Sequence, residues 1–86
     1  MQLTLTYHQD PGHGWLEVPL KHIDALQLRD RISCYSYQKG ASAYLEEDCD
    51  AAVFMSAARA AGWTIQLREI HTEFDNPIRD FPPFTN

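Results

Sequence analysis

The sequence is poor in cysteine and has no long apolar run. Two cysteines are too few for the disulfide framework of a small secreted protein, so we expect Cys34 and Cys49 to be free thiols. No stretch approaches the ~18 apolar residues of a membrane-spanning helix. The N-terminal residues lack the basic and apolar segments of a signal peptide. These absences predict a cytoplasmic protein.

Basic residues are also scarce: seven Lys and Arg stand against twelve Asp and Glu, which gives a formal net charge of −5. The basic residues are scattered, whereas binding a nucleic-acid backbone requires them in clusters. Direct nucleic-acid binding is therefore not expected, and a basic protein partner or simple solubility is favoured. The hydrophobic share of 44% is normal for a folded protein, so the chain should fold without a metal or a covalent cross-link.

Periodic patterns predict the secondary structure. Helical spacing predicts a short helix over residues 19–27 and an Ala-rich helix over residues 48–61, which Asp48 would cap and Gly62 would end. Ile70 is out of phase with the preceding apolar residues, which predicts a bulge or strand end near Glu69. Alternating apolar and polar residues predict five strands, over residues 2–8, 15–18, 33–38, 43–46 and 63–68.

The element order ββαββαβ predicts an α+β fold, with a mainly antiparallel sheet of about five strands and two helices on one face. Residues 1–71 would form a single domain, and the Pro-rich tail 72–86 would pack back on it. The second sheet face looks polar, which suits either water or a partner.

Acidic residues gather where the second helix should begin, at Glu46, Glu47, Asp48 and Asp50. One interpretation is that they stabilise the helix N-terminus through its dipole. Another is that they contact a basic partner. A cation site is less favoured, because the spacing does not match an EF-hand loop.

Tyr35 and Tyr37 lie on a predicted hairpin with Lys39 at its turn. Aromatic side chains on a sheet are typical of single-strand nucleic-acid platforms and also of protein interfaces. Because the chain is acidic, we favour the protein interface.

His8, Asp10 and His13 surround a turn in which Pro11-Gly12 predicts a type II geometry with positive φ at the glycine. Two imidazoles and a carboxylate are the ligand types that zinc or iron takes. Their spacing matches no recognised metal motif, and a solvent-exposed turn is the alternative. A pairing of Cys34 or Cys49 with a histidine would depend on whether His8, His22 or His71 lies near in space. The sequence carries no recognised catalytic motif.

Three segments resemble one group of proteins: DPGHGWLEVP (10–19), ISCYSYQKG (32–40) and YLEEDCDAAVF (44–54). They resemble short uncharacterised proteins of bacteriophages and related mobile elements, over roughly residues 8–63. The resemblance carries over no catalytic or binding residue. It implies a phage-like setting in a host bacterial cytoplasm, where small acidic proteins resemble stoichiometric inhibitors of host defence, anti-CRISPR proteins included.

We therefore expect a non-enzymatic, cofactor-free protein-binding domain. One alternative is a metal-binding module or metal-dependent enzyme that uses His8, Asp10 and His13. Another is a homodimeric scaffold, formed by edge-strand pairing or by packing of the polar sheet face. The expected contact residues are Glu46, Glu47, Asp48, Asp50, Tyr35 and Tyr37.

Overall fold

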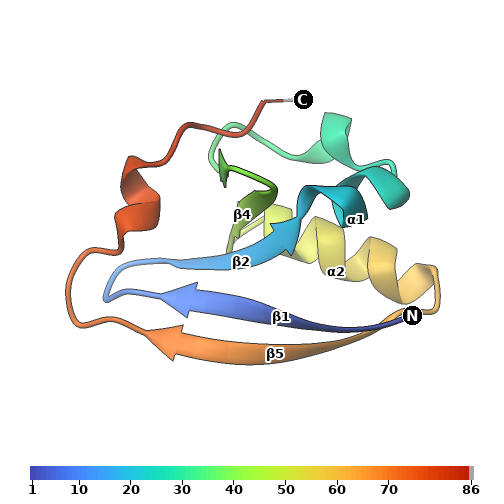
Figure 1. Cartoon of the computed structure of the whole chain (residues 1–86), viewed down its shortest axis with the longest axis horizontal. Helices are drawn as coiled ribbons and strands as arrows, with labels where there is room; N and C mark the ends of the chain where they lie inside the picture. The colour runs from blue at the N-terminus through green and yellow to red at the C-terminus, as the bar shows by residue number, and fades with distance from the viewer. Residues whose placement is uncertain (86) are drawn as a thin grey trace.

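The computed structural model describes residues 1–85 and contains one five-stranded sheet of order β3-β4-β2-β1-β5 (Figure 1). Strand β5 runs parallel to β1, and the other three pairings are antiparallel. The predicted α+β fold with a mainly antiparallel sheet is confirmed. The strands are β1 (Gln2–Gln9), β2 (Gly14–Pro19), β3 (Tyr37–Lys39), β4 (Ser42–Glu46) and β5 (Thr64–His71).

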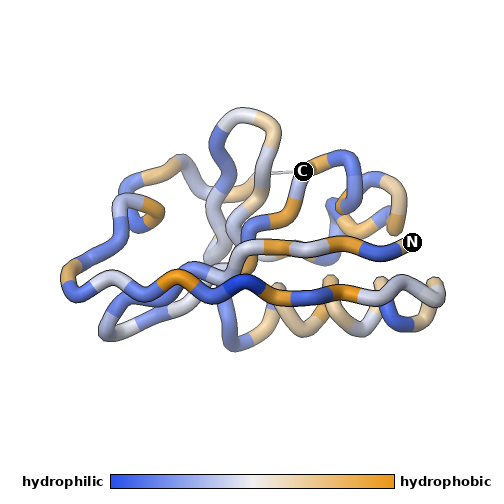
Figure 2. Tube along the Cα trace, turned by 60° about the horizontal axis from the view of Figure 1, so that its bottom comes forward, coloured by the Kyte–Doolittle hydropathy of each residue, from blue (hydrophilic) through white to orange (hydrophobic). Residues whose placement is uncertain are grey.

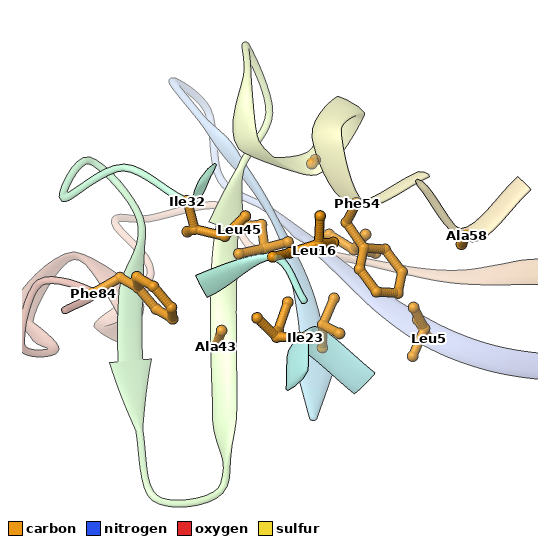
Figure 3. Close-up of a cluster of buried hydrophobic side chains, with 12 residues drawn as sticks. Leu5, Leu16, Ile23, Ile32, Ala43, Leu45, Phe54, Ala58 and Phe84 are labelled. Atoms are coloured by element: carbon orange, nitrogen blue, oxygen red, sulfur yellow. The ribbon is translucent and has the colours of Figure 1, made fainter. Parts of the chain in front are cut away.

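Helices α1 (Leu20–Ala25) and α2 (Asp50–Ala60) share one hydrophobic core with the sheet. Ile23 from α1 and Phe54 from α2 are fully buried against Leu16 and Leu45 of the central strands (Figure 3). Two short 3-10 helices, η1 (Arg29–Arg31) and η2 (Pro77–Asp80), complete the structure. Over residues 1–85, no helix is long and apolar enough to cross a bilayer.

The predicted bulge near Glu69 is wrong. Strand β5 pairs with β1 in unbroken register, from Gln2 beside Thr64 to Gln9 beside His71. Ile70 pairs with His8, on the sheet face opposite to that of the inward-facing leucines of β1. The shifted position of Ile70 in the apolar pattern therefore means that its side chain lies on the other face of the sheet, and not that the strand is interrupted.

The third strand is shorter than predicted, because residues 33–36 form a turn that reaches Asp50. The Ser33 amide and hydroxyl and the Ser36 hydroxyl donate to the same Asp50 oxygen, at 3.0, 2.6 and 2.6 Å. These side-chain bonds draw the segment away from the sheet, so β3 begins only at Tyr37.

The start of α2 also differs from the prediction. Asp48 does not cap the helix: the N-cap residue is Cys49, and its side chain makes no capping bond. The Glu46 carboxylate instead accepts from the backbone N–H groups of Asp48, Cys49 and Asp50, at 2.7, 2.8 and 2.9 Å. The predicted end of the helix is confirmed, since Gly62 has a φ of 80°.

The C-terminal segment lies back against the sheet. The Phe84 N–H donates to the Ser36 carbonyl at 2.8 Å, and the Phe84 side chain is buried. The ring of Phe81 packs on Tyr44, with 5.1 Å between centroids, and so covers part of the sheet face that was expected to be polar. The last residue of the predicted tail, Asn86, lies outside the described residues.

Candidate functional site

A pocket of about 410 Å³ opens beside the ends of β2 and β4. Four stretches of chain meet there: the β1–β2 turn with the start of β2, the segment before and into β3, the junction between β4 and α2, and the C-terminal segment. Figure 1 shows η2 of the C-terminal segment beside the β1–β2 turn. The pocket is lined by His13, Trp15, Tyr35, Tyr37, Glu46, Asp48, Cys49 and Arg79.

Aromatic rings surround the buried Trp15, which is only 3% exposed. The Tyr37 ring meets it edge-on at 6.4 Å between centroids, and the His13 ring lies tilted at 6.0 Å. The Arg79 guanidinium carbon is 5.5 Å from the indole centroid, which is cation–π geometry. Tyr35 is 78% exposed at the rim, where a partner can reach it.

Asp10 anchors Arg79. The Arg79 Nε and Nη2 groups donate to the two Asp10 carboxylate oxygens, at 2.6 and 2.8 Å. The carboxylate also accepts from the backbone N–H groups of Gly12, His13 and Asn76. The Arg79 guanidinium first, and then these amides, hold the pKa of Asp10 well below its usual range, against the opposing effect of burial.

This carboxylate also determines the turn, and the predicted type II geometry is wrong. Positive φ occurs at Gly40 and Gly62 among the glycines of the described chain, and not at Gly12. The hydrogen bonds that the Gly12 and His13 amides donate to Asp10 hold the turn instead, as is typical of Asx turns.

The predicted metal-ligand set is not brought together. His8 Nε2 lies 2.8 Å from the Glu17 carboxylate, Asp10 is occupied by Arg79, and His13 faces the pocket. Within residues 1–85, a group of three candidate ligand atoms within 4.8 Å of one another occurs only at Glu46, Cys49 and Asp50. The two carboxylates of that group already accept amide and serine hydrogen bonds.

The four acidic candidates have different roles. Glu46 holds the helix N-terminus, and Glu47 accepts from the Tyr7 hydroxyl at 3.2 Å. Asp50 is 1% exposed, so its predicted role as a contact residue is wrong. The carboxylate of Asp48 makes no hydrogen bond to the rest of the described chain, and it lines the pocket.

Tyr7 is held on the other face of the sheet. Its ring lies across Gly14, where any side chain would collide with the phenol. Burial first, and then the Glu47 carboxylate, raise the pKa of Tyr7 to about 12. The bond to Glu47 therefore ties β1 to the segment that enters α2.

The remaining histidines and cysteines do not gather in one place. His22 is buried, with its ring edge against Trp63 at 5.7 Å between centroids. Burial lowers the pKa of His22, and the neighbouring Lys21 lowers it further. Cys34 and His71 are exposed, and Cys49 is an exposed residue of the pocket lining.

The pocket brings together residues that belong to three separate features of the sequence: Tyr35 and Tyr37, Glu46 and Asp48, and His13. Trp15 and Arg79 were missed. Arg79 lies in a segment without periodicity, so no local pattern pointed to it. In the sequence, Trp15 is only the apolar first residue of a predicted strand, and nothing in the pattern marks it as part of a site.

The chain matches no protein-family profile, no curated protein and no solved structure.

Proposed function

We propose that the chain is a non-enzymatic protein-binding domain whose pocket accepts an Arg or Lys side chain from a basic surface of its partner. The observation that carries this proposal is the meeting of the exposed Tyr35, the Tyr37 ring and the exposed Asp48 carboxylate at one open pocket.

The aromatic lining suits a cationic side chain. A guanidinium over an aromatic face is stabilised by the ring quadrupole, and tyrosines and tryptophans are frequent anchors of protein interfaces. Arg79 already packs on Trp15 in this way. The incoming group would therefore use Tyr35 and Tyr37, which line the same pocket.

The charge balance also favours a cation. The cationic side chain of the lining is Arg79, which is paired with Asp10. A second carboxylate, that of Asp75, lies 3.8 Å from the Arg79 Nε. The carboxylates of Glu46 and Asp48 then leave the pocket negative. The net charge of −5 would attract a basic partner protein to the chain, whereas it would repel nucleic acid.

Binding fits the pocket better than acid–base catalysis does. The Glu46 carboxylate is held by three backbone amides, and Arg79 is held by the buried Asp10 carboxylate. A rigid, preorganised wall of this kind lowers the entropy lost on binding.

The phage-like segments support one class of partner. In the cytoplasm of a bacterial host, an acidic domain of this kind would act as a stoichiometric inhibitor of a defence complex. It would occupy a basic surface on which that complex binds nucleic acid.

The ligand chemistry is tested by NMR titration of the labelled chain with N-acetyl-arginine amide, and with the neutral isostere N-acetyl-citrulline amide as control. We expect the Trp15 indole N–H and the Tyr35 and Tyr37 rings to shift with arginine at roughly millimolar concentration. Equal shifts with both compounds, or shifts confined to other residues, would contradict the proposal.

The partner is tested by affinity capture from host lysate, followed by mass spectrometry. Tyr35→Ala and Asp48→Lys should each reduce capture of a basic protein by at least about tenfold, a loss typical of interface anchors. Phe74→Ala and Glu73→Lys are matched controls, since Phe74 is 80% exposed and Glu73 is exposed, and both lie outside the pocket. If the pocket variants capture as well as the controls do, the pocket is not the binding surface.

A further inference from the structure

Strand β5 forms an open edge of the sheet. It is last in the strand order, and in Figure 1 no other element lies beyond it. The N–H groups of Thr64 and Thr72 point toward β1 and donate to Met1 and Gln9, at 2.9 and 2.8 Å. Peptide groups alternate in direction along a strand. The intervening odd-numbered residues therefore direct their N–H and C=O groups outward, at Ile65, Leu67, Glu69 and His71.

This edge has few of the features that protect a sheet edge from pairing. Natural edge strands are blunted by proline, by charged side chains, especially lysine, by bulges or by extreme shortness. β5 is eight residues long, pairs with β1 in unbroken register and contains neither proline nor lysine, and its charged residues are confined to the adjacent Arg68 and Glu69. Figure 2 shows the strand at the front, and its apolar and polar residues alternate over residues 64–68. Leu67 near the middle of the strand is 49% exposed.

We propose that β5 pairs antiparallel with β5 of a second copy of the chain, about a two-fold axis at Leu67. A two-fold axis perpendicular to the sheet makes an identical edge complementary to itself, because each outward N–H then faces an outward C=O. The result is one continuous sheet across two copies.

Charge and length select this register. An axis at Arg68 or at Glu69 would place two like charges directly opposite each other, which destabilises a strand pair. An axis at Gln66 avoids that conflict but pairs only residues 64–68 of β5. An axis at Leu67 pairs residues 64–70, and it sets Leu67 against Leu67 of the second copy.

The rest of this register contains no opposed like charges. Arg68 lies opposite Gln66 of the second copy, and Glu69 lies opposite Ile65 of the second copy, on the other sheet face. The Leu67 contact at the axis removes apolar surface from water in both copies at once.

This dimer does not depend on the proposed pocket. The pocket is built beside β2, β3 and β4, whereas β5 is at the other end of the strand order. Dimerisation would leave both pockets open and give two partner-binding sites per particle, and so would raise the avidity for a multivalent partner.

The test is sedimentation equilibrium of the wild-type chain from about 1 μM to 1 mM, the range in which weak dimers dissociate. We expect a concentration-dependent dimer. Leu67→Lys should weaken it at least about tenfold, because it removes the apolar contact and opposes two like charges. Ala60→Lys adds the same charge at an exposed position of α2 and should leave the dimer unchanged. Circular dichroism checks the fold of each variant.

A mixed sample of labelled and unlabelled chains tests the register, because NOEs between Gln66 and Arg68 of different copies are expected only for an axis at Leu67. A wild-type monomer over the whole range would overturn the proposal, even if β5 then accepts a strand from another protein. A dimer that Leu67→Lys leaves intact would also overturn it.

Discussion

Arg79 forms an ion pair with Asp10, which lies near the other end of the sequence. The Arg79 Nε and Nη2 groups donate to the two carboxylate oxygens at 2.6 and 2.8 Å. This pair joins the first hairpin turn to the C-terminal segment. It also places the guanidinium against Trp15 in the pocket. The anchoring of the tail and the shape of the pocket therefore depend on the same contact.

Asp10→Asn should lower the urea midpoint of unfolding at pH 7 and weaken its dependence on pH. The pKa of Asp10 lies below the usual value of about 4, so the stabilisation is complete above that pH and is lost as the pH falls toward the lower folded pKa. The difference between wild type and variant should thus narrow below about pH 4. Urea titrations from pH 7 to pH 2 measure it, with the exposed Glu73→Gln as control. A difference that stays constant with pH would contradict this assignment.

Glu46→Ala should destabilise the protein by about 1–2 kcal/mol, because the amides of Asp48, Cys49 and Asp50, which lead into α2, lose their acceptor. Asp48→Ala is the matched control, and it should change stability by less than about 0.5 kcal/mol, as is usual at exposed positions. Chemical denaturation monitored by circular dichroism measures both. A larger loss of unfolding free energy in Asp48→Ala than in Glu46→Ala would indicate that Asp48 caps the helix.

Asp50→Ala should reduce the free energy of unfolding by about 3 kcal/mol, because the buried Ser36 hydroxyl and the partly buried Ser33 donors lose their acceptor. The triple variant Asp50→Ala, Ser33→Ala, Ser36→Ala should lose less than the sum of the single changes. Urea denaturation of the series gives the coupling. Strict additivity would show that the three side chains do not act together.

Gly14→Ala should cost about 2 kcal/mol, since the new methyl group collides with the Tyr7 ring. In a Tyr7→Ala background the same change should cost much less, because the ring is gone. The four unfolding free energies form a double-mutant cycle. A cost that does not depend on Tyr7 would point to the backbone and not to the ring.

Glu47→Gln should lower the pKa of Tyr7 from about 12, because it removes the nearby negative charge and the charged acceptor of the hydroxyl. Burial, the largest cause, remains, so the pKa should stay above the usual value of about 10. Titration of the Tyr7 ring carbons by NMR measures the change, and Glu73→Gln serves as the charge-matched control. An unchanged pKa of Tyr7 in Glu47→Gln would mean that Glu47 does not contribute to it.

Local pattern was enough to identify the α+β class, the order of strands and helices, and the end of α2 at Gly62. Alternation and helical spacing record which face of each element is apolar, and burial of those faces makes one layered core. Residue type also indicated part of the pocket lining, such as Tyr35 among the aromatic residues and Asp48 in the acidic group, although not as one site.

Only the tertiary structure decided which polar groups meet. Tyr7 and Glu47 are 40 residues apart, and Asp10 and Arg79 are 69 apart. From the sequence Asp50 is a surface charge, but in the structure Ser33 and Ser36 donate hydrogen bonds to it. Glu46, and not Asp48, accepts the amides before α2, because the end of β4 places its carboxylate there. The physical reason is that apolar burial follows a period along the chain, whereas a polar side chain is satisfied by whichever partner the folded backbone brings within hydrogen-bonding distance.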